Sequence, residues 1–183
     1  FKAMGLDYIY VDHGNDVGEL IEAFQSVKDS RKPVVVHINT LKGKGYAPAE
    51  QNKEVWHYNG PFHIETGEPL YEMTEEDYSD ISLNYLLDKM KKDPAVVAIT
   101  SGTPTVMGFT EDKRKEAGKQ FVDVGIAEET AVALASGIAA NGGKPVYGVY
   151  STFVQRTYDQ IAQDLCINNS PATIVTFCGS VYG

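Results

Sequence analysis

Cysteine, tryptophan and long apolar runs are scarce in this sequence of 183 residues. Its two cysteines, Cys166 and Cys178, fall in an expected helix and an expected strand, and we expect both to be free and buried. No apolar run reaches the roughly 20 residues that cross a bilayer. The start, Phe-Lys-Ala-Met-Gly-Leu, also lacks the basic and apolar blocks of a signal peptide. These absences are typical of a soluble cytoplasmic protein without a membrane partner.

Positive charge is also in short supply. The sequence has 16 Lys and Arg residues against 25 Asp and Glu residues, which gives a net charge of -9 and a pI near 4.9. A chain of this charge disfavours non-specific binding to nucleic acid or to anionic membranes, so we expect no nucleic-acid partner.

Several motifs of catalysis and metal binding are missing. CxxC and HExxH do not occur, and the four histidines are scattered, so we predict no metal site within this chain. The absence of GxSxG excludes the common serine-nucleophile elbow. The phosphate-loop pattern GxxxxGK[ST] and the dinucleotide pattern GxGxxG are absent too.

The hydrophobic fraction of 43% is sufficient for a packed core, and the first forty residues read as strand, helix and strand. Residues 8–11 resemble a short strand, and Asp16 is suited to be the N-cap of a helix over residues 17–27. Residues 33–40 form a continuous apolar and β-branched run, which is typical of a strand covered on both faces. This order predicts a βαβ unit.

Residues 47–77 show little periodicity and many turn signals. Unstructured loops of this length connect domains or carry function, so we expect an inter-domain linker. Its Trp56 and His57 are expected to pack across another part of the protein. The run Lys-Gly-Lys-Gly at residues 42–45 could meet an anion, but such a run alone is more typical of a solvated loop.

From residue 78 onward, helices and strands alternate. We expect helices near residues 78–92, 127–140 and 153–166, and strands near residues 95–100, 121–124, 145–149 and 172–177. This alternation predicts an α/β fold with a mainly parallel, doubly wound sheet. The low number of strands and the abrupt ends of the chain lead us to expect that both ends are cut.

Residues 121–156 contain two turns whose charged and aromatic side chains could bind a ligand. Glu128 follows a strand at the start of a helix, where it could serve a ligand or simply stabilise the helix start. Tyr150 and Phe153 flank the next strand end, as site residues or as core aromatics. Arg156 could bind a phosphate or carboxylate, or could form a surface ion pair with Asp159 or Asp123. Because turns after parallel strands meet at one edge, we expect a ligand site there.

The same residues resemble a known family. Gly-Ile-Ala-Glu-Glu at residues 125–129, followed by Tyr-Ser-Thr-Phe-Val-Gln-Arg at residues 150–156, is similar to the 1-deoxy-D-xylulose-5-phosphate synthases. These are thiamine-diphosphate enzymes of the transketolase superfamily. Residues 42–50, Trp-His at 56–57 and residues 93–100 fit the same family in the same order, so that the resemblance covers nearly the whole chain.

The resemblance implies a role for each of six residues. Glu128 matches the catalytic glutamate that hydrogen-bonds N1′ of the cofactor's aminopyrimidine, and Phe153 matches the aromatic residue that stacks on that ring. The other implied roles are cofactor contact for Tyr46, an active-site histidine for His57, and substrate binding for Tyr150 and Arg156.

The resemblance also implies the reaction. Family members decarboxylate pyruvate on thiamine diphosphate and join the two-carbon unit to D-glyceraldehyde 3-phosphate. The product, 1-deoxy-D-xylulose 5-phosphate, is a precursor of isoprenoids, thiamine and pyridoxal. The implied cofactors are thiamine diphosphate and Mg²⁺, and the implied assembly is a homodimer.

The chain departs from the family pattern at two places and lacks one motif. Glu129-Thr130 stands where Gln-His is usual, and Phe-Cys-Gly-Ser at residues 177–180 replaces Asp-Arg-Ala-Gly. The Gly-Asp-Gly…Asn motif, which anchors Mg²⁺ and diphosphate, does not occur, so we expect the metal ligands outside this chain.

The resemblance divides the chain into three parts. Residues 1–46 are expected to be the tail of a diphosphate-binding domain, residues 47–77 a linker, and residues 78–183 an incomplete pyrimidine-binding domain. An isolated fragment of this kind is expected to be inactive. Two other hypotheses stay open, namely a transketolase-like enzyme with different substrates and a non-catalytic remnant that serves assembly.

Overall fold

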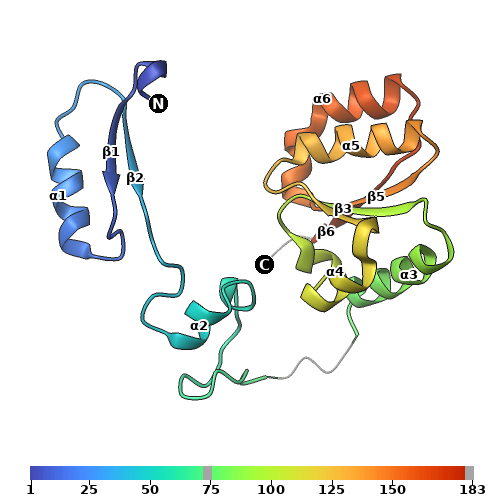
Figure 1. The fold of residues 1–183 in the computed structure, drawn as a ribbon, viewed down its shortest axis with the longest axis horizontal. Coiled ribbons are helices and arrows are strands. Elements are labelled where there is room, and N and C mark those ends of the chain that lie inside the picture. The colour runs from blue at the N-terminus through green and yellow to red at the C-terminus, as the bar shows by residue number, and fades with distance from the viewer. Residues whose placement is uncertain (72–75, 180–183) are drawn as a thin grey trace. The chain divides into compact units, whose positions relative to one another are not determined.

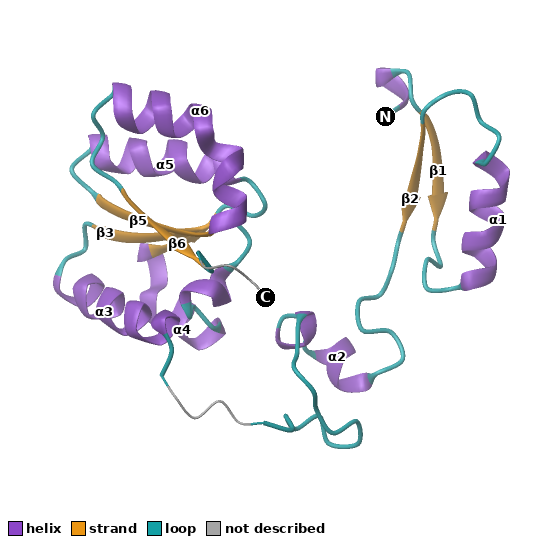
Figure 2. Ribbon diagram, turned by 180° about the vertical axis from the view of Figure 1, so that it is seen from behind, coloured by secondary structure: helices purple, strands orange, loops and turns teal. Residues whose placement is uncertain are grey.

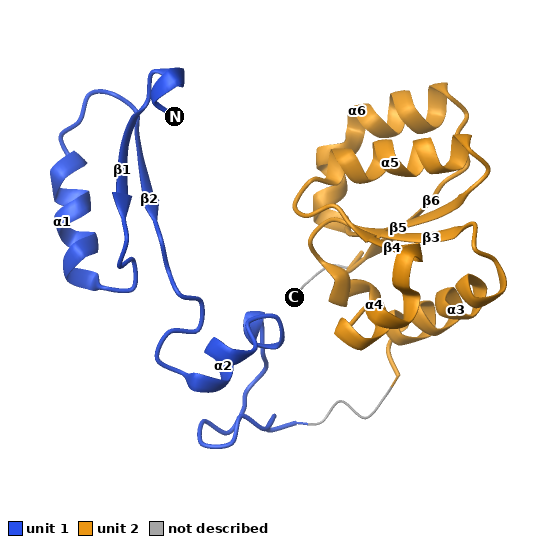
Figure 3. Ribbon diagram, viewed as in Figure 1, with its two compact units in different colours: residues 1–73 blue, residues 74–183 orange. Residues whose placement is uncertain are grey.

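The computed structural model describes residues 1–71 and 76–179. The chain divides into two compact units, Phe1–Met73 and Thr74–Gly183 (Figure 3). Each unit has its own parallel sheet and is described by itself below.

The first unit begins with the expected βαβ arrangement. After a 3₁₀ turn at Lys2–Met4, strand β1 (Asp7–Val11), helix α1 (Val17–Val27) and strand β2 (Val34–Ile38) follow (Figure 1). The two strands pair in parallel, with Tyr8 opposite Val35. Asp16 is the N-cap of α1 and accepts hydrogen bonds from the amides of Gly18 and Glu19. The cap satisfies two amides that the helix itself leaves unpaired.

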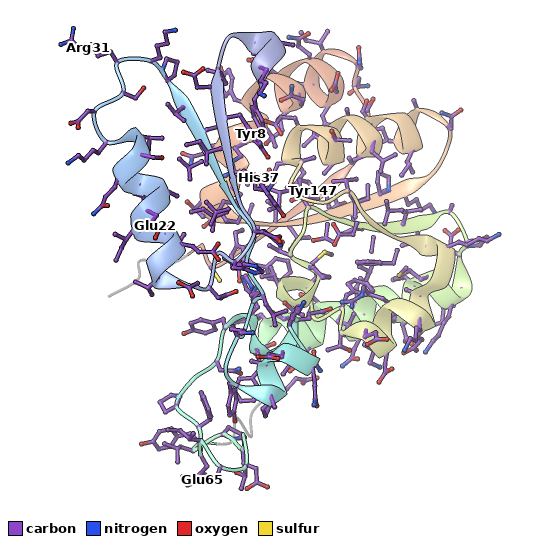
Figure 4. All side chains as sticks on the ribbon, turned by 60° about the vertical axis from the view of Figure 1, so that its left-hand side comes forward. Tyr8, Glu22, Arg31, His37, Glu65 and Tyr147 are labelled. Carbon is purple, nitrogen blue, oxygen red and sulfur yellow. The ribbon has the colours of Figure 1, made fainter. Side chains whose placement is uncertain are left out.

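The prediction that the second strand is covered on both faces is wrong for the described residues. No residue of β2 is buried, and α1 contributes no buried side chain either. A two-stranded sheet with a single helix leaves its other face without a covering layer. On β1 and β2 the hydroxyl of Tyr8 lies 2.7 Å from Nδ1 of His37, and both side chains are labelled in Figure 4.

The expected linker contains more structure than its sequence pattern indicates. Helix α2 (Ala47–Gln51) and a 3₁₀ turn (Val55–His57) lie within it. The rings of Tyr46, Trp56 and Phe62 pack together, with centroids 4.8 to 5.9 Å apart. Contacts between aromatic residues distant in sequence produce no helical or strand periodicity of apolar residues. For this reason the sequence pattern of the segment predicts a loop. Residues 72–75 of the predicted linker lie outside the described residues.

The second unit is the expected α/β fold. Four parallel strands stand in the order β4-β3-β5-β6. Figures 1 and 2 show α3 and α4 on one face of this sheet and α5 and α6 on the other, which makes it doubly wound. The strands are β3 (Val96–Thr100), β4 (Phe121–Asp123), β5 (Lys144–Tyr150) and β6 (Thr173–Phe177).

The helices of this unit include the two expected near residues 78–92 and 127–140, one at residues 111–117 that the sequence did not predict, and one expected helix that differs in type. They are α3 (Tyr78–Lys92), α4 (Glu111–Ala117) and α5 (Glu128–Ala140), with 3₁₀ turns at Pro104–Met107 and Gly118–Gln120. The expected helix at residues 153–166 is instead a 3₁₀ segment (Ser151–Thr157), α6 (Tyr158–Gln160) and a π-helical segment (Ile161–Ile167). Such changes of helical type are common at functional sites.

Each face of the sheet has its own apolar cluster. Leu83, Leu87 and Met90 of α3 pack with Phe109 against one face. Val132 and Ala135 of α5 pack with Val149 and Tyr147 against the other. The apolar spacing of α3 and the small residues of α5 explain why these helices lie close to the strands.

Both cysteines are free, as expected, but the prediction that they are buried is wrong. Cys166 lies in the π-helical segment and is exposed. Cys178 is also exposed, and it follows β6 with a φ of +55°. Neither residue therefore acts as a small core side chain.

Gly148 in β5 offers a test of the packing. An added Cβ there would overlap the side chain of Met107, which is buried, so Gly148→Ala is expected to destabilise the fold. Overpacking of this kind costs about 1–3 kcal/mol. The control is Gly137→Ala in α5, where nothing lies within 4 Å of an added Cβ and a gain of about 0.5–1 kcal/mol is expected. Urea denaturation measures both variants, and equal effects would contradict this packing.

Candidate functional site

The strand order gives the second sheet a position at which parallel sheets commonly bind ligands, at the carboxyl ends of its strands. The chain passes from β3 to β4 in one direction and then crosses back to β5 on the other side of β3. Connections after β3 and β5 therefore leave on opposite faces, as Figure 2 shows. In open parallel sheets, ligands bind in the crevice at such a switch point, outside the carboxyl ends of the strands.

Asp123, at the end of β4, joins two turns at this edge. Its Oδ1 accepts hydrogen bonds of 2.8 Å from the amides of Gly102 and Gly125. Both glycines have positive φ, +78° and +73°, a conformation that favours glycine. The carboxylate thus fixes the turn after β3 to the turn that leads into α5. The sequence suggests Asp123 only as an ion-pair partner of Arg156 and does not predict its contacts with the two turns.

Glu128 is the first residue of α5 and is almost completely buried, with 2% of its side chain exposed. Its Oε1 accepts a hydrogen bond of 2.9 Å from Nη1 of Arg156. A buried carboxylate needs such a partner, because loss of hydration is costly for a charge. The neighbouring acid, Glu129, is exposed, and its charge can stabilise the N-terminus of α5 while it stays in contact with water.

Aromatic side chains flank the ion pair. The rings of Tyr150 and Phe153 meet edge to face with centroids 5.7 Å apart. The guanidinium carbon of Arg156 lies 5.2 Å from the centroid of Phe153. The structure therefore brings together four predicted site residues of this unit. The alternative in which Arg156 pairs with Asp159 or Asp123 is wrong, since its ion pair is with Glu128.

A second buried polar pair lies nearby and was missed in the sequence. The hydroxyl of Tyr147 on β5 (Figure 4) lies 2.9 Å from Oγ of Ser101, which follows β3. Burial raises the pKa of Tyr147, the hydrogen bond to Ser101 opposes this, and the carboxylates of Glu128 and Glu129 raise it further. The only indication of this pair in the sequence is the hydroxyl group of Tyr147 within an otherwise apolar strand.

The predicted site residues of the first unit occupy different surroundings. Tyr46 donates a hydrogen bond of 3.0 Å to the carbonyl of Ile64 and packs on Trp56. His57 contacts the ammonium of Lys42 through Nδ1. Lys42 belongs to the run that reads as a solvated loop, and this contact was not foreseen. It places a basic side chain beside the predicted active-site histidine.

The described residues also limit what else the chain can hold. Within residues 1–71 and 76–179, no group of three or more His, Cys, Asp or Glu side chains is arranged to hold a metal ion. Over the same residues, none of the helices combines the length and the apolar character that a membrane span requires. Of the sequence departures, Cys178 and Gly179 follow β6, whereas Ser180 lies outside the described residues.

The fold and the site define an α/β ligand-binding domain with a buried acid at the carboxyl edge of a parallel sheet. Residues 75–183 match the family described as transketolase, pyrimidine binding domain. Because this match covers more than half of the chain, the protein belongs to that family.

The similar proteins are more specific. The chain is 41% identical over its whole length to 1-deoxy-D-xylulose-5-phosphate synthase 1 of Geobacter sulfurreducens, of which it covers 29%. It is 42% identical over 93% of its length to the 1-deoxy-D-xylulose-5-phosphate synthase of Natranaerobius thermophilus, of which it covers 27%. A synthase of the same name from Acaryochloris marina is 42% identical over 97% of the chain, which covers 28% of it. The chain thus spans less than a third of these relatives.

The Asp123 contacts lead to a prediction about the turns. Asp123→Ala removes the acceptor of the Gly102 and Gly125 amides, so both amides should exchange hydrogen faster. The expected loss of stability is about 1 kcal/mol, because the carboxylate is exposed to water. Hydrogen exchange by NMR measures the effect, with Asp112→Ala in α4 as control. Unchanged protection of both amides would show that Asp123 does not hold the turns.

Tyr147 leads to a prediction about alkaline pH. Its pKa is raised by burial from the ordinary value of 10.0, so the native state releases this proton later than the unfolded chain does. The resulting stability is present below pH 10.0 and is lost as pH rises through the higher native pKa. Tyr147→Phe should reduce the loss of unfolding free energy in this range, whereas Tyr158→Phe, at an exposed position, should not. Equal alkaline curves for Tyr147→Phe and the parent would contradict the burial of this phenol.

Proposed function

We propose that the chain forms the pyrimidine side of the active site in a 1-deoxy-D-xylulose-5-phosphate synthase. The observation that carries this proposal is the buried carboxylate of Glu128 at the start of α5, beside Phe153 and Arg156. The similarity to synthases of that name supports the choice of reaction. In this reaction pyruvate loses CO₂ and its two-carbon unit joins D-glyceraldehyde 3-phosphate.

The residues fit the aminopyrimidine ring of thiamine diphosphate. A desolvated carboxyl group can hydrogen-bond a ring nitrogen, and an aromatic face can stack on a flat heterocycle. Glu128 and Phe153 supply these two features, and the guanidinium that contacts both of them connects them in space. When bound, the cofactor supplies the carbanion chemistry that decarboxylation and carboligation require.

Glu128 has the central role in this proposal. Its carboxyl group holds the proton at N1′ of the pyrimidine, and its burial keeps water from competing for that hydrogen bond. Phe153 supports the ring from one side. The Asp123 contacts keep the turn before Glu128 in place, so that the carboxyl group is positioned before the ligand arrives.

The remaining predicted residues serve the substrates and the rest of the cofactor. Arg156 and Tyr150 bind the phosphate side of D-glyceraldehyde 3-phosphate, for which a guanidinium fork is well suited. In the first unit, His57 acts near the reacting carbons and Tyr46 contacts the cofactor. Lys42 adds a positive charge beside His57, which favours anionic ligands there.

The proposal includes an assembly and a location. Mg²⁺ binds with the diphosphate through ligands outside this chain, and the enzyme is a cytoplasmic homodimer. Its product enters isoprenoid, thiamine and pyridoxal synthesis. The parts at residues 1–46, 47–77 and 78–183 are the tail of the diphosphate-binding domain, the linker and the pyrimidine-binding domain. Alone, the chain is inactive.

One observation favours a second candidate, a transketolase-like enzyme with other substrates. At the end of β6, Phe177 stands where an aspartate is usual in the synthases and Cys178 where an arginine is usual, and the carbonyl of Cys178 accepts a hydrogen bond of 2.7 Å from Ser151. This contact brings the altered segment beside the turn that carries Tyr150 and Phe153. The wall of the substrate site therefore lacks one acidic and one basic side chain of the usual pattern.

Glu128→Gln tests the proposed function. In a protein of the relatives' full length that carries this chain, the variant should lose at least about 100-fold in turnover of pyruvate with D-glyceraldehyde 3-phosphate. The amide cannot hold the proton at N1′ as a carboxyl group does. Product formation is measured against ketose-phosphate and aldose-phosphate pairs, which test the second candidate.

Glu129→Gln is the matched control, because it removes the same charge from the exposed neighbouring position. It should retain most of the activity. If Glu128→Gln turned over substrate as fast as the parent protein, the catalytic role of Glu128 would be refuted. Activity only with sugar-phosphate pairs would favour the transketolase-like alternative.

A further inference from the structure

Arg156 contacts the two groups that the proposed function reserves for the cofactor ring. Its Nη1 donates to the carboxylate of Glu128 at 2.9 Å, and its guanidinium carbon lies 5.2 Å from the centroid of Phe153. The planar guanidinium of Arg156 thus pairs with the buried carboxylate of Glu128 and lies over the ring of Phe153. These are the contacts that an aminopyrimidine needs.

The chemistry of a guanidinium explains this double contact. It is flat and delocalised, it carries N–H donors in its plane, and it stacks on aromatic rings. An aminopyrimidine shares the flat shape and the polar nitrogen atoms at its edge. We propose that Arg156 is an internal substitute for the cofactor ring, which it replaces at Glu128 and Phe153 until thiamine diphosphate binds. This inference rests on the proposed function.

Burial shows which partner of the ion pair can leave. The Glu128 side chain is 2% exposed, whereas that of Arg156 is 46% exposed. Loss of the partner leaves the glutamate buried, but the arginine can exchange its contact for water. The moving group is therefore the guanidinium, and the carboxylate stays in place to receive the ring.

The backbone beneath Arg156 is well anchored. The next residue, Thr157, is 1% exposed, and its hydroxyl donates a hydrogen bond of 2.7 Å to the carbonyl of Val154. The exchange is therefore a rotation of the Arg156 side chain on a fixed 3₁₀ segment (Ser151–Thr157). A long side chain with one half-exposed end can make this movement without unfolding the helix.

The exchange couples the cofactor to the phosphate of the substrate. Once displaced from Glu128, the guanidinium is free to pair with a phosphate group, so a phosphate monoester favours the displaced state. Cofactor and phosphate ligand then strengthen each other's binding, and this coupling is reciprocal. In the cofactor-free protein the arginine instead satisfies the buried carboxylate and lowers affinity for the ring.

The test measures thiamine diphosphate affinity by calorimetry in a protein of the relatives' full length that carries this chain, with Mg²⁺ present. If Arg156 holds Glu128 about nine-tenths of the time, the apparent dissociation constant is weakened about tenfold. Arg156→Gln should therefore bind the cofactor about tenfold more tightly than the parent protein. Arg156→Lys, which keeps the charge but loses the planar fork, should show a smaller gain.

Lys144→Gln is the matched control. It also removes one positive charge from an ion pair, that of Lys144 with Asp93 at 2.6 Å, but at the other end of β5. Its cofactor affinity should equal that of the parent protein. Glycerol phosphate should tighten cofactor binding in the parent and in Lys144→Gln, and should have no effect in Arg156→Gln.

The outcomes separate the inference from the function on which it rests. If the parent binds thiamine diphosphate and Arg156→Gln binds it equally or more weakly, Arg156 is no substitute for the ring and this inference is overturned. If the parent binds no thiamine diphosphate, the proposed function fails and the inference falls with it. Thermal unfolding checks that Arg156→Gln is folded, and if it is not, the affinity of Arg156→Lys decides.

Discussion

The buried carboxylate of Glu128 is the constraint on which the site of the second unit depends. A charged group with 2% exposure is stable only where a partner replaces its lost hydration. Arg156 provides that partner from the segment after β5, 28 residues further along the chain. Because the guanidinium also lies over Phe153, one buried acid determines where a cation and an aromatic ring stand. The same environment that makes the carboxylate costly makes it useful, since a desolvated carboxyl group interacts strongly with a ring nitrogen.

The parallel sheet explains how these residues meet. Strands β3, β4 and β5 end at one edge, so the turns after them are neighbours although they are far apart in sequence. Asp123 strengthens this arrangement by binding the amides of two of these turns. Beneath them, Tyr147 and Ser101 form a buried hydroxyl pair that links β5 to the end of β3. The site therefore rests on hydrogen bonds between turns and strands as well as on the apolar clusters of the sheet.

Local signals in the sequence predicted much of this fold. The cap at Asp16, the apolar spacing of α3 and the alternation of strands and helices follow from interactions between near neighbours, and the structure confirms them. The features that the sequence did not predict depend on contacts between residues distant in sequence. The pairing of Arg156 with Glu128, the contact of Lys42 with His57 and the aromatic packing in the expected linker leave no periodic pattern. The exposure of both cysteines was missed because residue type alone favours burial, whereas their surroundings decide it.

Two interpretations of Arg156 that look exclusive in the sequence are compatible in the structure. An ion pair with an acid suggests a structural role, and a guanidinium at a strand end suggests a binding role. A site that keeps a buried carboxylate ready for a ligand needs some partner for it while the ligand is away. A residue that supplies this partner must then be displaced when the ligand arrives, and its charge becomes available to a second ligand. The stability of the empty site and the affinity of the site for its ligand are therefore opposed through the same contact.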